Sequence, residues 1–243
     1  ALDAVPTKGI LTQLSKSSSI ERSEARMSLV TGDRSPDPTL QDAKFRFGKG
    51  ISLATTGTDP VGHPALAILR RRSARSFTGE AIRQEQLAAI LGYAYRFDLV
   101  QPELGPSQIF VDPSLLSTWV VVHNVGGTAP GVYHYAPAHH ELKLVDAGDF
   151  REKTHELSLG QDLAYAAAAV IIHTCDLPAA VGTWGDRAYR ISHLDAGHLG
   201  QRMSLAAIAS ELGTSGIGGF FDEHVNDLLA IPTREACIYI TCV

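Results

Sequence analysis

The sequence predicts an α+β protein in which helices cover the faces of an antiparallel or mixed sheet. Two observations predict the sheet. Residues 118–123 form a short β-branched run, and residues 131–135 and 141–144 alternate around a proline-containing turn, which is typical of a hairpin. A third observation predicts the helices, because apolar residues recur at helical spacing in residues 87–94 and 193–212.

The first half of the folded region follows these signals in order. The helix around residues 87–94 places apolar side chains at i, i+3, i+4 and i+7, and its start is expected near Thr78-Gly79. The strand over residues 118–123 and the hairpin come next. The alanine-rich residues 161–169 favour a helix, which runs directly into a buried strand over residues 170–174.

The second half is dominated by a long helix. We expect a polar connection over residues 178–190, followed by the helix over residues 193–212, which is apolar on several sides and is therefore buried. Residues 213–221 are rich in glycine. Residues 223–229 favour a short helix, and residues 236–242 form the last strand.

Composition limits the possible partners. The net charge is −5, which gives no electrostatic case for binding nucleic acid or an anionic membrane. The longest apolar run, residues 163–172, is too short to span a membrane. The three cysteines have no C-x-x-C spacing and behave as small hydrophobes in a reducing cytoplasm. No metal site is predicted, and we expect a cytoplasmic protein.

The chain divides into two parts. Residues 1–60 are polar and rich in Ser, Thr, Gly and Asp, and they are expected to form an N-terminal arm with one helix over residues 19–29. Residues 61–243 are expected to form one domain that carries the chemistry.

An arginine-rich stretch, residues 70–77, precedes the first long helix. It holds four guanidinium groups and two hydroxyl groups, which match the geometry of a phosphate. Taken alone, the stretch is equally consistent with a solvated basic surface.

Four segments together make residues 64–243 resemble the FMN-dependent nitroreductase superfamily, and within it the SagB-type dehydrogenases. The first segment is Arg-Arg-Ser-Ala-Arg-Ser-Phe at residues 71–77. The second is Pro106-Ser107, followed at family spacing by Pro-Gly-Val-Tyr-His-Tyr at residues 130–135. The third runs from Gly185 to Gln201, and the fourth is Gly-Ile-Gly-Gly-Phe at residues 216–220.

The resemblance implies a nitroreductase-like sandwich with a mostly antiparallel sheet, in an intertwined homodimer that binds one FMN at each of two subunit-interface sites. It also implies three groups of FMN-binding residues. The first group, at the phosphate and ribityl chain, is Arg71, Arg72, Ser73 and Arg75. The second group, against the flavin ring, is Pro106, Ser107 and Gln108. The third group, near the reactive edge, is Gly216, Gly218 and Gly219.

The chain departs from the SagB-type pattern at two places. Residues 108–112 contain no glycine, although the family has a glycine-rich stretch there. SagB-type enzymes that oxidise azolines carry a Lys-Tyr pair before the Gly-x-Arg motif, and this chain has Thr183 and Trp184 at those positions. Neither side chain replaces a lysine amine, so the proton goes to another group or the substrate differs. Trp184 is also suited to stacking on a planar substrate or on flavin.

The leading functional hypothesis is an FMN-dependent dehydrogenase of natural-product biosynthesis. It oxidises a heterocyclic or aminoacyl-derived substrate, such as azoline to azole, and O2 reoxidises the flavin. The substrate is a small molecule, a peptide or a carrier-bound intermediate, and other biosynthetic enzymes are potential partners. One alternative is an NAD(P)H-dependent nitroreductase or quinone reductase. Another is a non-catalytic scaffold of a biosynthetic complex.

Overall fold

A seven-stranded antiparallel sheet forms the centre of the molecule. The computed structural model describes residues 50–54, 60–62, 64–95 and 113–243. Within these residues the strands lie in the order β1 (Gly50–Ser52), β6 (Glu141–Ala147), β5 (Gly131–Ala136), β3 (Leu116–Val122), β7 (Ala169–Asp176), β9 (Glu235–Cys242) and β8 (Ser215–Ile217). Two short strands, β2 (Ile82–Arg83) and β4 (Val125–Gly126), pair in parallel beside it.

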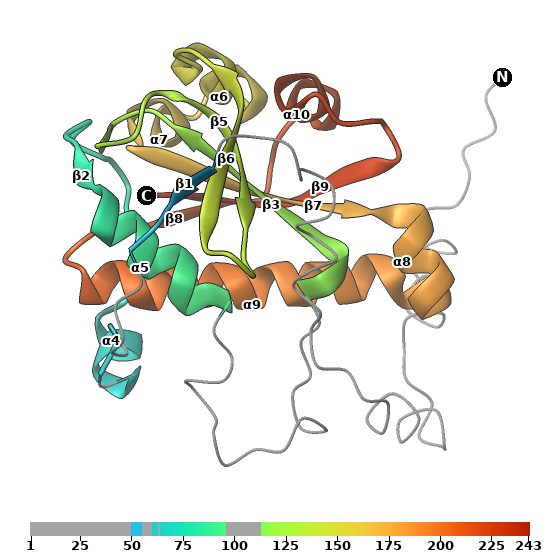
Figure 1. The fold of residues 1–243 in the computed structure, drawn as a ribbon. Helices are drawn as coiled ribbons and strands as arrows, with labels where there is room; N and C mark the ends of the chain where they lie inside the picture. The colour runs from blue at the N-terminus through green and yellow to red at the C-terminus, as the bar shows by residue number, and fades with distance from the viewer. Residues whose placement is uncertain (1–49, 55–59, 63, 96–112) are drawn as a thin grey trace, which may run out of the picture.

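Helices cover both faces of the sheet (Figure 1). One face carries α5 (Gln84–Tyr95) and the long helix α9 (Ala188–Ala209). The opposite face carries α6 (Arg151–Leu157), α7 (Asp162–Ala166) and α10 (Asp222–Leu229). The helices α4 (Pro64–Arg70) and α8 (Leu177–Trp184) lie near the two ends of α9, which therefore spans the whole width of the molecule.

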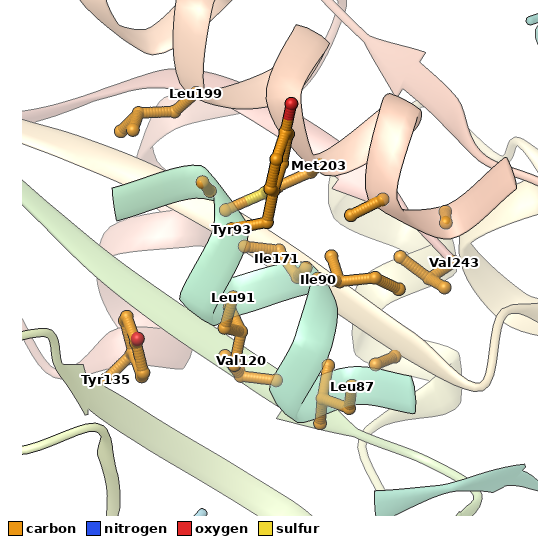
Figure 2. Packing of buried hydrophobic residues seen from close by; sticks show 14 of the residues in the cluster. Leu87, Ile90, Leu91, Tyr93, Val120, Tyr135, Ile171, Leu199, Met203 and Val243 are labelled. Atoms are coloured by element: carbon orange, nitrogen blue, oxygen red, sulfur yellow. The ribbon is translucent and has the colours of Figure 1, made fainter. Parts of the chain in front are cut away.

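The core on the α9 side is formed by side chains of α5, α9 and the sheet. Leu87, Ile90 and Leu91 of α5 are fully buried against Val120 and Ile171 of the sheet (Figure 2). Next to α5 on the same face of the sheet, α9 contributes two further buried apolar side chains, Leu199 and Met203. Burying large apolar side chains from both helices on one sheet face fixes the position of α9.

The predicted α+β fold is confirmed, and so are its main elements. The expected hairpin is the β5–β6 pair, in which Tyr135 opposes Leu142. The strands expected over residues 118–123, 170–174 and 236–242 are β3, β7 and β9. The helix expected over residues 161–169 is shorter, because α7 ends at Ala166 and Ala169 already begins β7.

The expectation of a polar connection over residues 178–190 is wrong. Residues Leu177–Trp184 form α8, a short turn of 3₁₀ helix follows, and α9 begins at Ala188. The Asp176 carboxylate accepts a hydrogen bond of 3.1 Å from the Ala179 backbone N–H, which caps α8. An acidic cap followed by proline is a helix start signal, and it had been visible in the sequence.

The end of the predicted N-terminal arm belongs to the sheet. Gly50–Ser52 pair with β6 as strand β1, with Ile51 opposite Leu142. The helix expected over residues 19–29 lies outside the described residues, and the domain boundary at residue 60 stays a prediction. No helix in the described part of the chain is long and apolar enough to cross a membrane.

The three cysteines are buried and form no disulfide within the described residues, as predicted. Burial raises the pKa of the Cys242 thiol to about 12, and it also raises the pKa of Cys237. These thiols therefore stay protonated and act as small apolar core residues.

Two buried histidines make stability depend on pH. His173 accepts or donates one hydrogen bond of 2.9 Å with the Thr118 hydroxyl, and His123 bonds the Ala167 carbonyl at 3.0 Å. Burial lowers the pKa of each imidazole to about 4. In the unfolded chain the pKa is about 6.5. The unfolded state therefore binds more protons between these values, and the free energy of unfolding falls as pH decreases through this window.

We expect this loss to approach about 1.4 kcal/mol per pH unit for each histidine below pH 6. Urea unfolding at several pH values between 7 and 4.5 measures it. The variant His173→Gln does not titrate, so its unfolding free energy should fall less steeply with decreasing pH. The same slope in both proteins would contradict the assignment.

Candidate functional site

A polar cavity lies between α9, β8 with the residue before it, β9 and the segment that follows α4. Its volume is about 90 Å³. The residues that line it are Arg71, Ser73, Gly197, Gly200, Gln201, Ser204, Thr214, Gly216 and Tyr239. These residues include one guanidinium group, several hydroxyl groups and no carboxylate, so the cavity is suited to an anion or to a group rich in acceptors.

Backbone pairing brings Arg71 and Ser73 to this cavity. The Arg71 N–H donates to the Ala67 carbonyl at 2.9 Å and so closes the last turn of α4. Ser73 then forms a parallel bridge with Thr214, and the Ala74 N–H donates to the Thr214 carbonyl at 2.8 Å. Two segments that are far apart in the sequence therefore run side by side at the edge of β8.

A chain of hydroxyl groups fixes one wall. Thr214 Oγ1 donates to Ser204 Oγ at 3.1 Å, and Ser204 Oγ donates to the Gly200 carbonyl at 2.9 Å. These two hydroxyls are already satisfied by the protein. Within the described residues, the side chains of Arg71, Ser73 and Gln201 make no hydrogen bond, so their donors are free to bind a ligand.

The predicted phosphate-binding residues divide into two groups. Arg71 and Ser73 line the cavity, whereas Arg72 and Arg75 are exposed and do not. Arg72 Nη1 donates to the carbonyls of Leu69 at 3.0 Å and Arg71 at 2.7 Å. The Arg72 guanidinium thus binds free backbone acceptors at the end of α4.

The predicted glycine group also divides. Gly216 lies in β8 and lines the cavity. Gly218 and Gly219 follow the strand and do not line it. A Cβ on Gly219 would lie 3.1 Å from Cδ1 of Leu159, an exposed side chain outside the cavity. The predicted ring contacts Pro106, Ser107 and Gln108 lie outside the described residues.

The structure does not bring Thr183 and Trp184 to this cavity. Both lie in the last turn of α8, where the Thr183 hydroxyl donates to the Ala179 carbonyl at 3.1 Å and Trp184 packs partly buried against the core. The nearest lining residue on α9 is Gly197, nine residues after the helix begins, or about 13 Å along its axis. A role for this pair in chemistry at the same cavity stays a prediction.

Tyr239 is a lining residue that the sequence analysis missed. Its side chain is half-buried, and burial raises the pKa of its phenol while the nearby Arg71 guanidinium lowers it in part. The sequence alone cannot distinguish a strand tyrosine that lines a cavity from one that packs in the core. The small residues Gly197, Gly200 and Ser204 were a detectable signal, because their spacing places them along one side of α9.

The cavity residues fit the phosphate end of FMN. A phosphate is bound well by guanidinium and hydroxyl groups, and the described lining residues offer both without an opposing carboxylate. Pockets that enclose a whole cofactor have volumes of roughly 300 Å³ or more, so this cavity accommodates only a part of such a ligand. The residues that would hold FMN here are Arg71 and Ser73, with Gln201 beside them.

Comparison with known proteins identifies relatives over most of the chain. One relative is MJ1384 of Methanocaldococcus jannaschii, whose name describes it as a nitroreductase. The two sequences are 31% identical over 172 residues, which is 68% of this chain and 82% of MJ1384. TfxC of Rhizobium leguminosarum bv. trifolii, named as a trifolitoxin operon protein, is 25% identical over 207 residues, covering 79% of this chain and 58% of the relative.

A solved structure shows the same fold. It is the structure of a protein of Anabaena variabilis whose name also describes it as a nitroreductase. That protein is 42% identical to this chain, with a TM-score of 0.75 over 82% of this chain. This chain spans only 42% of the length of that protein. The model of the nitroreductase family matches residues 68–243. Because this match covers the whole sheet beyond β1 and every residue that lines the cavity, the chain belongs to the nitroreductase family.

Proposed function

We propose that this protein is an FMN-dependent oxidoreductase whose cofactor phosphate binds in the cavity of Arg71 and Ser73. The single observation that carries the proposal is the convergence of unpaired donors from the segment after α4, from α9 and from β9 on one cavity, whose described lining residues include no carboxylate. When bound, FMN supplies two-electron hydride chemistry. The residues of the cavity would bind the phosphate and thereby anchor the flavin.

Arg71 and Ser73 have separate roles in this proposal. The Arg71 guanidinium offers a planar pair of N–H donors for two phosphate oxygens, and the Ser73 hydroxyl offers a third donor at short range. Arg72 stabilises the end of α4 through its bonds to Leu69 and Arg71.

We further propose a homodimer that covers the outer surface of α9. Several large apolar side chains on α4, α8 and α9 are more than half exposed in the single chain, which supports an interface there. They are Leu66, Ile68, Leu69, Val181, Tyr189 and Leu194. A partner subunit on this surface would also enclose the part of FMN that the cavity leaves uncovered.

Replacing Leu194 with Glu is expected to convert the dimer to a monomer, because it places an unpaired charge in an apolar interface. Leu194 is 66% exposed on α9 in the single chain. Sedimentation velocity at micromolar concentration measures the change. The matched control is Leu144→Glu, at a 43% exposed leucine on β6, which should stay dimeric. A dimeric Leu194→Glu variant would contradict this interface.

The finer assignment is a SagB-type dehydrogenase of natural-product biosynthesis that oxidises a heterocyclic or aminoacyl-derived substrate. The similarity to a trifolitoxin operon protein supports it. Thr183 and Trp184 stand in place of the Lys-Tyr pair, and neither has a side chain that takes up a proton at neutral pH. An azoline oxidation would therefore need another proton acceptor.

The second candidate is an NAD(P)H-dependent nitroreductase, which the family name of MJ1384 and the missing Lys-Tyr pair favour. Two assays on purified protein loaded with FMN distinguish the nitroreductase from the dehydrogenase. NAD(P)H consumption that requires a nitroaromatic acceptor supports the nitroreductase. O2 consumption that requires a thiazoline or oxazoline peptide supports the dehydrogenase. A colourless protein that does not bind added FMN would refute both and would favour the scaffold.

A further inference from the structure

The ring of Tyr239 occupies a space that two glycines leave open. A Cβ on Gly200 of α9 would lie 2.6 Å from Tyr239 Cε1, and a Cβ on Gly216 of β8 would lie 1.8 Å from the phenol oxygen. Neither distance is compatible with a side chain at these positions. The helix and the strand thus hold the ring between them and direct its hydroxyl into the cavity.

The hydroxyl of Tyr239 has no hydrogen-bond partner within the described part of the chain. Among the other lining residues, the hydroxyls of Thr214 and Ser204 already have protein partners, and the Arg71 guanidinium is a donor only. The Arg71 guanidinium is close enough to act electrostatically on the phenol. Burial keeps the phenol protonated at neutral pH by raising its pKa, so the group is a donor beside a cation.

We propose that the Tyr239 hydroxyl donates a hydrogen bond to the same phosphate that Arg71 binds, as a residue of the FMN site provided by β9. This inference rests on the proposed function, because it names an additional residue of that site. The packing between Gly200 and Gly216 restricts the ring to one position, so little conformational entropy is lost when the hydroxyl binds a ligand. Gly216 then serves the site by making room for Tyr239.

The test compares FMN with riboflavin, which has the same ring system and ribityl chain and lacks the phosphate. Quenching of flavin fluorescence gives the dissociation constant of each ligand for the full chain. In Tyr239→Phe the dissociation constant for FMN should rise at least about tenfold, since a bond to a charged group is lost. The dissociation constant for riboflavin should stay within about twofold of the wild-type value.

Two further variants make the result specific. Gly216→Ala retains the hydroxyl but displaces it, because of the contact with Tyr239, and should also weaken FMN binding more than riboflavin binding. Tyr165→Phe, at an exposed tyrosine of α7 on the opposite face of the sheet, is the control and should leave both constants unchanged. Thermal unfolding of each variant shows whether the fold is intact.

The outcomes separate this inference from the proposed function. Wild-type protein that binds no FMN overturns both. Wild-type protein that binds FMN, with an unchanged constant in both Tyr239→Phe and Gly216→Ala, overturns the role of Tyr239 alone. An equal loss for FMN and riboflavin overturns the phosphate contact, because it places the hydroxyl at the ring or the ribityl chain.

Discussion

Replacing Arg71 and Ser73 together with Ala is expected to weaken FMN binding by about 3 kcal/mol or more, which is over a hundredfold in the dissociation constant. Both side chains line the carboxylate-free cavity, and neither is paired with another side chain in the described residues. Removing them therefore eliminates the charge-assisted bonds to the ligand, and it breaks no side-chain interaction within the described part of the protein. Equilibrium dialysis or fluorescence quenching with FMN measures the effect.

Arg72→Ala is the matched control for this pair. Arg72 adjoins Arg71 in the sequence and carries the same charge, but its guanidinium binds the Leu69 and Arg71 carbonyls. Its loss should change FMN affinity by less than about fivefold, which is about 1 kcal/mol. Stoichiometric FMN in the purified double variant, or an equally large loss in Arg72→Ala, would refute the division of roles between these arginines.

Replacing Arg202 with Met is expected to lower the free energy of unfolding by about 3 kcal/mol. Arg202 is a buried residue of α9, and its Nε donates to the carbonyls of Tyr93 and Ala94 at 2.9 Å each. A second nitrogen of the guanidinium, Nη2, also donates to the Tyr93 carbonyl, and the guanidinium lies over the Tyr93 ring, 4.5 Å from its centroid.

The acceptors explain the size of the expected loss. Tyr93 and Ala94 lie in the last turn of α5, where backbone carbonyls have no partner within the helix. Arg202 satisfies them and so joins α5 to α9, whose other residues form the wall of the cavity. Methionine fills most of the same volume without replacing these bonds.

Urea unfolding at pH 7 measures the change, with Arg83→Ala as the control. Arg83 is an exposed arginine of β2, and its loss should cost less than about 0.5 kcal/mol. A cost below about 1 kcal/mol in Arg202→Met would show that water or neighbouring groups satisfy the carbonyls of α5 instead.

Local pattern was sufficient to predict most of the fold. The alternation in residues 131–144 predicted the β5–β6 hairpin, and the spacing of Leu87, Ile90 and Leu91 predicted α5. Both are periodic signals contained within a few turns or strands. Residues 178–190 were predicted wrongly because their average polarity hides the start signal of α8, an acidic cap at Asp176 followed by proline.

The candidate site was predictable only in part, because its residues come from distant segments. The arginine motif and the glycine motif indicated an FMN site, but they did not show that Arg71 faces the cavity while Arg72 binds the end of α4. Consecutive residues after a helix leave it in different directions. Their roles therefore depend on which backbone groups lie nearby.

The sequence by itself predicted the main strands and helices along the chain and the segments proposed to bind the cofactor, since these predictions depend on hydrophobic period and local motifs. Only the tertiary structure decided which residues meet. The Ser73–Thr214 bridge places the arginine segment beside β8, and the contact of Gly200 and Gly216 with Tyr239 brings a phenol into the cavity. Those contacts depend on how α9 packs on the sheet, and the pattern of residues along the sequence does not specify this packing.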